Sequence, residues 1–156
     1  MSATAQNALA QDAERKQIAL RELDAQIQQA IFGWREVESE EDFFGDDGKI
    51  VKLPCLMLES PDGQRRIFHL HIPRYTEDLN HAFRVVCEVA EKSRWYELVW
   101  RPNAAVANFT GDPHDNAVVL LEEAGGDRLK AQCLAIVLAA LKWQNVPTAK
   151  CGEMGS

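Results

Sequence analysis

Apolar residues recur at helical spacing near both ends of the chain, with alternating runs between them. The first helical set is spaced by three or four residues and comprises Leu20, Leu23, Ile27, Ala30, Ile31 and Trp34. This spacing predicts an amphipathic helix that ends near Gly33, since glycine is favoured just beyond a helix C-terminus. The small, polar residues 1–12 are expected to be a flexible N-terminus.

Strand-like runs at residues 52–60 and 64–72 flank the turn sequence Pro61–Asp62–Gly63. A proline followed shortly by glycine suits a tight turn, so this region predicts a β-hairpin. The preceding residues 36–48 are rich in Asp and Glu and end on Asp47–Gly48, a turn signal. We expect them to form an exposed acidic loop.

A second helix is predicted to start at a Thr76 cap, because apolar residues then recur on one face. These are Leu79, Ala82, Phe83, Val86 and Val89. Further strands are expected at residues 95–100, 104–109 and 117–121, and Asp127 is expected to cap a largely buried last helix. The order predicts an α/β (α+β) fold, a three-layer α/β/α sandwich with a mainly antiparallel sheet of about five strands.

The composition favours one compact domain, at residues 13–146, followed by a tail at 147–156. A chain of 156 residues with 46% apolar residues can form one core. Its net charge of −7 argues against non-specific nucleic-acid binding, and no apolar run reaches the roughly 18 residues of a membrane span. Without a secretory signal pattern, a cytoplasmic location in a bacterial host cell is expected.

The four cysteines lack CxxC spacing. They are predicted to be free thiols, with Cys87 buried and inert on the second helix. No cofactor is expected. His69 and His71 would share one face of a strand and, with Asp78 or His81, could form a metal site, although polar histidines on a half-buried strand need no such role.

The best candidate for a ligand site is the segment that enters the second helix. Arg74 offers a cation, Tyr75 a stacking ring, and Thr76 and Asp78 lie at the helix start. Cation, ring and helix N-terminus together suit an anionic aromatic ligand such as a nucleotide. The alternative is that the same residues serve only to begin the helix.

Tryptophans next to arginines extend this prediction. Trp34, Trp100 and Arg101 are expected to contribute stacking and charge to the same site. Alternation through residues 95–100 places at least half of these aromatic side chains in the core.

Two segments also resemble the phage ABA sandwich domain family, small proteins encoded by phages and prophages. In residues 72–95, Tyr75, Thr76 and Asp78 match the family's central motif, while Glu77 and Phe83 depart from it. Residues 32–34 match moderately, and the Ala-rich helix within residues 128–146 matches in character. The resemblance implies a three-layer α/β/α fold and no established catalytic residues.

These observations predict a non-enzymatic phage or prophage protein that acts by binding, for example by sequestering a nucleotide-type immune signal of the host. The alternative is an interaction module whose acidic segment, with Phe43 and Phe44, docks on a basic host protein. A third alternative is a metal-assisted hydrolase using His69, His71 and Asp78. The apolar first helix and the tryptophans suit either a homo-oligomer surface or a monomer core.

Overall fold

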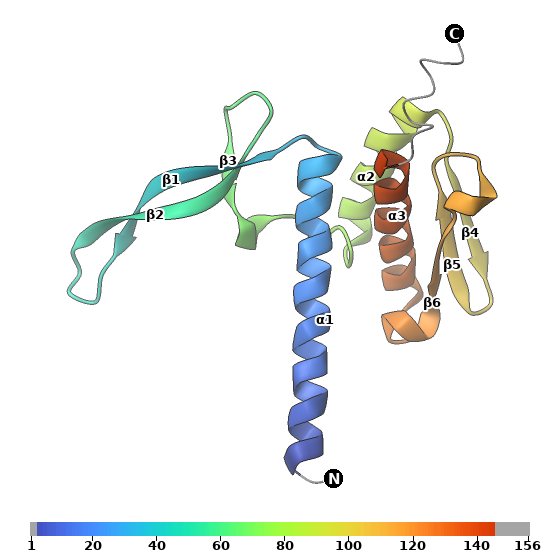
Figure 1. Ribbon diagram of the computed structural model, residues 1–156, viewed down its shortest axis with the longest axis horizontal. Helices are drawn as coiled ribbons and strands as arrows, with labels where there is room; N and C mark the ends of the chain where they lie inside the picture. Colours follow the sequence, from blue (N-terminus) through green and yellow to red (C-terminus); the bar gives the residue numbers. More distant parts are fainter. Residues whose placement is uncertain (1–2, 146–156) are drawn as a thin grey trace.

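The computed structural model describes residues 3–145 and contains two small sheets joined by helices (Figure 1). The elements are α1 (Ala3–Ala30), β1 (Arg35–Phe44), β2 (Ile50–Glu59), β3 (Arg66–Phe68), α2 (Leu79–Ser93), β4 (Glu97–Arg101), β5 (Ala104–Asn108), β6 (Ala117–Leu120) and α3 (Arg128–Asn145), with 3-10 turns at His69–His71, Pro113–Asp115 and Leu121–Ala124. The α+β class is confirmed. The tail predicted at 147–156 lies outside the described residues.

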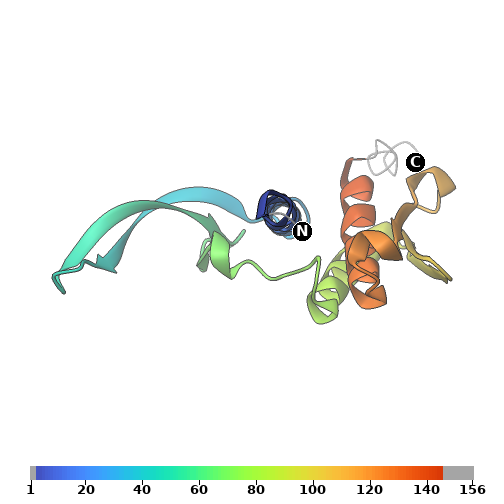
Figure 2. The same cartoon turned by 90° about the horizontal axis from the view of Figure 1, so that it is seen from below.

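The predicted single sheet of about five strands is wrong. Instead, β1–β2–β3 and β4–β5–β6 form separate antiparallel sheets. The first sheet extends as a long hairpin away from the helices, and Figure 2 shows that it curves. We call the hairpin Arg35–Glu59 the arm.

The acidic segment predicted as a loop is mostly a strand. Residues 35–44 pair with β2 along their whole length, from Arg35 opposite Glu59 to Phe44 opposite Ile50. The turn at the tip is as predicted, because Gly48 adopts a positive φ of 77°. The apolar partner strand therefore gives this acidic sequence its extended conformation.

A three-layer sandwich is not formed, because α2 and α3 cover the same face of the β4–β5–β6 sheet. Behind them lies α1, while no helix of the described chain covers the outer face of the sheet (Figures 1 and 2). Val99, Val106 and Val118 are paired across this outer face. Val118 remains 45% exposed.

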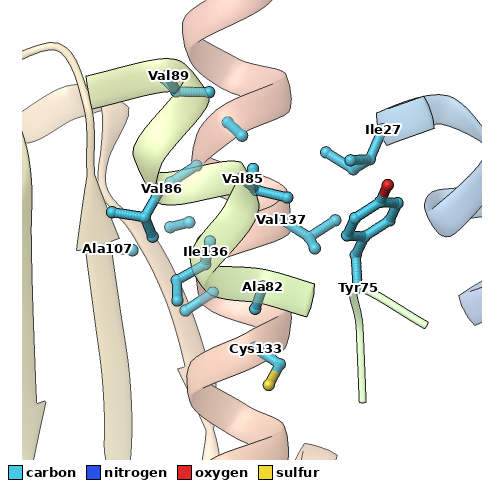
Figure 3. Packing of buried hydrophobic residues seen from close by; sticks show 14 of the residues in the cluster. Ile27, Tyr75, Ala82, Val85, Val86, Val89, Ala107, Cys133, Ile136 and Val137 are labelled. Carbon is cyan, nitrogen blue, oxygen red and sulfur yellow. The ribbon is translucent and has the colours of Figure 1, made fainter. Parts of the chain in front are cut away.

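The core lies between α2, α3 and the inner face of that sheet. Figure 3 shows Val85, Val86, Ile136 and Val137 interleaving beside Ala107 of β5. Burial of each such Val or Ile contributes about 1.5–3 kcal/mol. The alanines of β5 are small enough to let α3 approach closely.

Of the two helix caps predicted from the sequence, one is confirmed and one is wrong. Asp127 caps α3 by accepting from the amides of Leu129 and Lys130, as predicted. The helix α1 begins at Ala3, ahead of the first apolar position of the repeat that predicted it. The cap of α2 is Asp78, not Thr76, since the Asp78 carboxylate accepts from the first free amides of the helix.

No helix in residues 3–145 is long and apolar enough to cross a membrane.

Candidate functional site

The predicted ligand residues are dispersed. Arg74 is exposed and lies 3.8 Å from Glu77, while Tyr75 and Thr76 are buried. The carboxylate of Asp78 is engaged as the helix cap. The set therefore does not form one site, although Tyr75 shares a cavity with Trp34.

Trp100 and Arg101 lie on β4, on the far side of the helix layer (Figure 1). The Trp100 indole donates to Gln132 at 3.0 Å, and the Arg128 guanidinium lies over its ring at 5.1 Å. The same Arg128 donates to the Arg101 carbonyl at 3.1 Å. These contacts hold the start of α3 against the sheet, through the Trp100 side chain and the backbone carbonyl of Arg101.

One cavity is lined by aromatic and cationic side chains. It lies between the end of α1, the segment from the β2–β3 turn to Tyr75, and α2. Its volume is about 330 Å³, at the lower end of the roughly 300–1,000 Å³ found for small-ligand pockets. We call it the basic cavity. Its lining residues are Gln28, Phe32, Trp34, Arg65, Ile67, His71, Pro73, Tyr75 and Arg84.

The Tyr75 ring forms a fixed wall of the basic cavity. It stacks on Phe32 with ring centroids 5.5 Å apart and an interplanar angle of 20°. Its hydroxyl donates a hydrogen bond to the Gln28 side-chain oxygen. Burial raises the pKa of Tyr75 well above its usual value, so this hydroxyl stays protonated and keeps donating.

Two guanidinium groups reach the basic cavity from different elements. Arg65 lies over the Trp34 ring at 5.4 Å, while Arg84 projects from α2 and acts electrostatically on Tyr75. Neither arginine was predicted as a site residue from the sequence. Trp34 is not paired with a neighbour in the chain, because its partner Arg65 follows the Pro61–Gly63 turn.

The arm offers a second surface with two different faces. Cross-strand pairing puts Val37, Phe43, Val51, Leu53, Cys55, Met57 and Phe68 on one side, which we call the apolar face. The opposite side, the acidic face, carries the four β1 carboxylates Glu36, Glu38, Glu40 and Asp42, but also the apolar side chains Phe44, Ile50, Leu56 and Leu58. The fifth acidic residue of β1, Glu41, lies on the apolar face opposite Leu53. Alternation along β1 produces this division, because successive side chains point to opposite sides of a strand.

The two phenylalanines predicted as a joint anchor lie on opposite faces of the arm. Phe43 approaches the ring of Phe68 at 6.4 Å and is 37% exposed. Phe44 is 82% exposed, and its cross-strand partner Ile50 is 62% exposed. The tip therefore presents apolar groups on both sides.

An ion-pair clamp fixes the base of the arm. Glu59 accepts from Arg35 of β1 at 2.8 Å and from Arg66 of β3 at 2.9 Å. These hydrogen bonds, with the two positive charges, lower the pKa of Glu59. The clamp joins all three strands where the arm leaves the body of the protein.

The predicted metal site is not assembled. His69 and His71 lie in a 3-10 turn rather than a strand, and His69 is 3.4 Å from Glu36. Asp78 is occupied with the α2 amides. Within residues 3–145, no three His, Cys, Asp or Glu side chains are arranged to hold a metal ion.

Comparison with known proteins yields no family model, no curated protein and no solved structure that matches this chain. The resemblance to phage ABA sandwich proteins and the phage origin that it implies stay predictions, as does the separately inferred host-signal role.

Proposed function

We propose that this protein acts by binding a positively charged protein through the arm. The observation that carries the proposal is the exposure of large apolar side chains along a hairpin that projects from the core, including Phe44 at 82%, Ile50 at 62%, Leu56 at 48% and Leu53 at 47%. By the strand register, Phe44, Ile50 and Leu56 lie on the acidic face and Leu53 on the apolar face, so the arm exposes apolar groups on both sides. Exposed apolar patches rimmed by polar residues mark interaction sites.

The arm also has unpaired strand edges. The strand order leaves one edge of β1 free, and β3 pairs with β2 only at residues 57–59. Such edges can accept a further strand from another chain. A two-stranded ribbon is only marginally stable alone. A partner that covers the apolar side chains of the arm would therefore also stabilise the hairpin.

The charge of β1 selects the kind of partner. Five of its ten residues are acidic, and the whole chain carries a net charge of −7. Pairing β1 with its copy would place carboxylates close together, which is destabilising. A basic partner instead gains complementary charge, which speeds association and discriminates against wrong partners.

The test compares the native protein with a variant whose arm is shortened in register. Ser39 and Cys55 are cross-strand partners, so residues 40–54 can be replaced by Asn-Gly, a two-residue hairpin turn. Both proteins are immobilised on a resin and incubated with lysate of the source cells, and the captured proteins are quantified by mass spectrometry. We expect basic proteins to be captured by the native chain alone and released by salt.

A charge variant, Glu36→Gln with Glu38→Gln and Glu40→Gln, keeps the apolar tip and should weaken capture at low salt. Equal capture by the native and shortened proteins would contradict the proposal. Sedimentation of the purified chain distinguishes self-association: a dimer that dissociates on shortening would make a second copy the occupant and overturn the choice of a basic partner.

A further inference from the structure

We infer that the basic cavity binds a small anion that carries a planar ring, of the nucleoside monophosphate class. This site is separate from the apolar tip of the arm and does not depend on the arm's binding a protein. The inference rests on three properties of the lining: its charge, its aromatic walls and its size.

The charge of the lining opposes the charge of the protein. Arg65, Arg84 and His71 line the basic cavity, and no Asp or Glu does so, although acidic residues outnumber basic ones by 24 to 17 in the chain. Arg84 forms no ion pair within the described residues. Two carboxylates act on lining residues from outside the cavity: Asp62 interacts with Arg65, whose charge helps to lower the pKa of Asp62, and Asp24 helps to raise the pKa of Tyr75.

Two guanidinium groups from separate elements suit a phosphate. Each can donate two parallel hydrogen bonds to phosphate oxygens, and this geometry makes arginine a frequent phosphate ligand. Neither guanidinium donates a side-chain hydrogen bond to another described residue, so no internal bond is lost when an anion binds. When a ligand binds, the Arg65 guanidinium either moves off the Trp34 ring or stays there beside the ligand.

The aromatic lining suits a planar ring. Trp34 is half-buried and its ring already accepts a flat guanidinium at 5.4 Å. A nucleobase can stack on the same indole, a contact worth about 1–3 kcal/mol in single-stranded nucleic-acid complexes. The Tyr75 ring is held by Phe32 and Gln28, so this part of the lining is preorganised.

The size of the basic cavity selects one nucleotide rather than a longer ligand. Its volume of about 330 Å³ is near the minimum for small-ligand pockets. Gln28 uses its side-chain oxygen to hold Tyr75, which leaves its amide N–H groups to donate to a base edge. His71 offers an additional ring nitrogen.

The experiment is calorimetric titration of the full chain with the four common nucleoside 5′-monophosphates. At least one should bind, and the corresponding nucleoside without phosphate should bind at least tenfold more weakly. Arg65→Gln and Arg84→Gln should each weaken binding about tenfold or more. Arg74→Gln is the matched control, because Arg74 is exposed outside the basic cavity and its replacement should leave affinity unchanged.

Thermal melts of the three variants identify any loss that arises from misfolding. If Trp34→Leu also folds as the native chain does, it should reduce affinity for the nucleotide but not for inorganic phosphate. Failure of all four nucleotides to bind at millimolar concentration would overturn the inference, as would equal affinities for the native, Arg65→Gln and Arg84→Gln proteins. The shortened-arm variant should retain binding, so this inference and the proposed function can fail independently.

Discussion

The buried carboxylate of Asp24 on α1 accepts a hydrogen bond of 2.9 Å from the backbone amide of Thr76, in the segment that leads to α2. Arg21, one turn earlier, lies 2.8 Å from the same carboxylate and also donates to the Ile72 carbonyl at 2.9 Å. Through these contacts α1 fixes the segment that connects the arm to the core. The helix is therefore part of the fold's framework.

Replacing Asp24 should separate the role of the acceptor from that of the charge. Asp24→Ala leaves the buried Thr76 amide without an acceptor, which should lower the free energy of unfolding by about 1–3 kcal/mol. Asp24→Asn keeps an oxygen at that position and should cost less. Urea denaturation of both variants checks this order, and equal losses would contradict it.

Acidification should loosen the base of the arm. The pKa of Glu59 is lowered below its usual 4.5 by Arg35 and Arg66, so the folded state binds this proton more weakly than the unfolded chain. The clamp's stabilisation is full above pH 4.5 and is lost as pH falls through the lowered pKa.

Amide exchange at the β1–β2 and β2–β3 pairs, followed by NMR from pH 6 to pH 3, measures this effect. Exchange corrected for its intrinsic pH dependence should accelerate on acidification in the native chain. Glu59→Gln should show fast exchange already at pH 6 and little further change. A native profile that stays flat would contradict a role for the Glu59 charge.

Gly33 should tolerate no side chain. Its φ of 77° is unfavourable for other residues, and an added Cβ would lie 3.3 Å from Cγ of Pro61. Gly33→Ala should therefore destabilise the protein by about 1–3 kcal/mol. Gly125→Ala is the control in a thermal melt, since Gly125 has a similar φ of 67° but no neighbour within 4 Å; it should be the milder change.

The thiols should react in a fixed order. Cys87, predicted from its sequence to be buried, is exposed on α2, whereas Cys133 is buried on α3. Burial raises the pKa of Cys133 to about 12, which suppresses the reactive thiolate. Iodoacetamide labelling at pH 8 with peptide mass spectrometry should modify Cys87 in the folded protein and Cys133 only in urea. Early labelling of Cys133 would indicate a more open core.

Local signals in the sequence located the helices and the turns well. The Pro61–Gly63 turn, the Asp127 cap and the strands 97–101, 104–108 and 117–120 agree with the predictions to within about two residues. Each of these features is decided by residues close together in the chain. Glycine, proline and capping carboxylates act within a few positions, so their effects are readable locally.

Features decided by distant residues were not predictable in this way. Thr76 and Asp78 can both cap a helix; in the structure Asp78 accepts from the first amides of α2, and the Thr76 amide instead donates to the distant Asp24. The acidic β1 becomes a strand because β2 pairs with it. The basic cavity needs Arg65 and Arg84 beside Trp34. These residues are far apart in the chain, and no spacing pattern in the sequence predicts that they lie together.

The small side chains of β5 have an evolutionary consequence. Ala105 and Ala107 are fully buried against α3, itself lined by buried alanines such as Ala135 and Ala139, so a larger residue there would push the helix from the sheet. Most residues along the outer arm are exposed and do not constrain that packing. Mutations can therefore accumulate along the outer arm while the folding of the body is left intact.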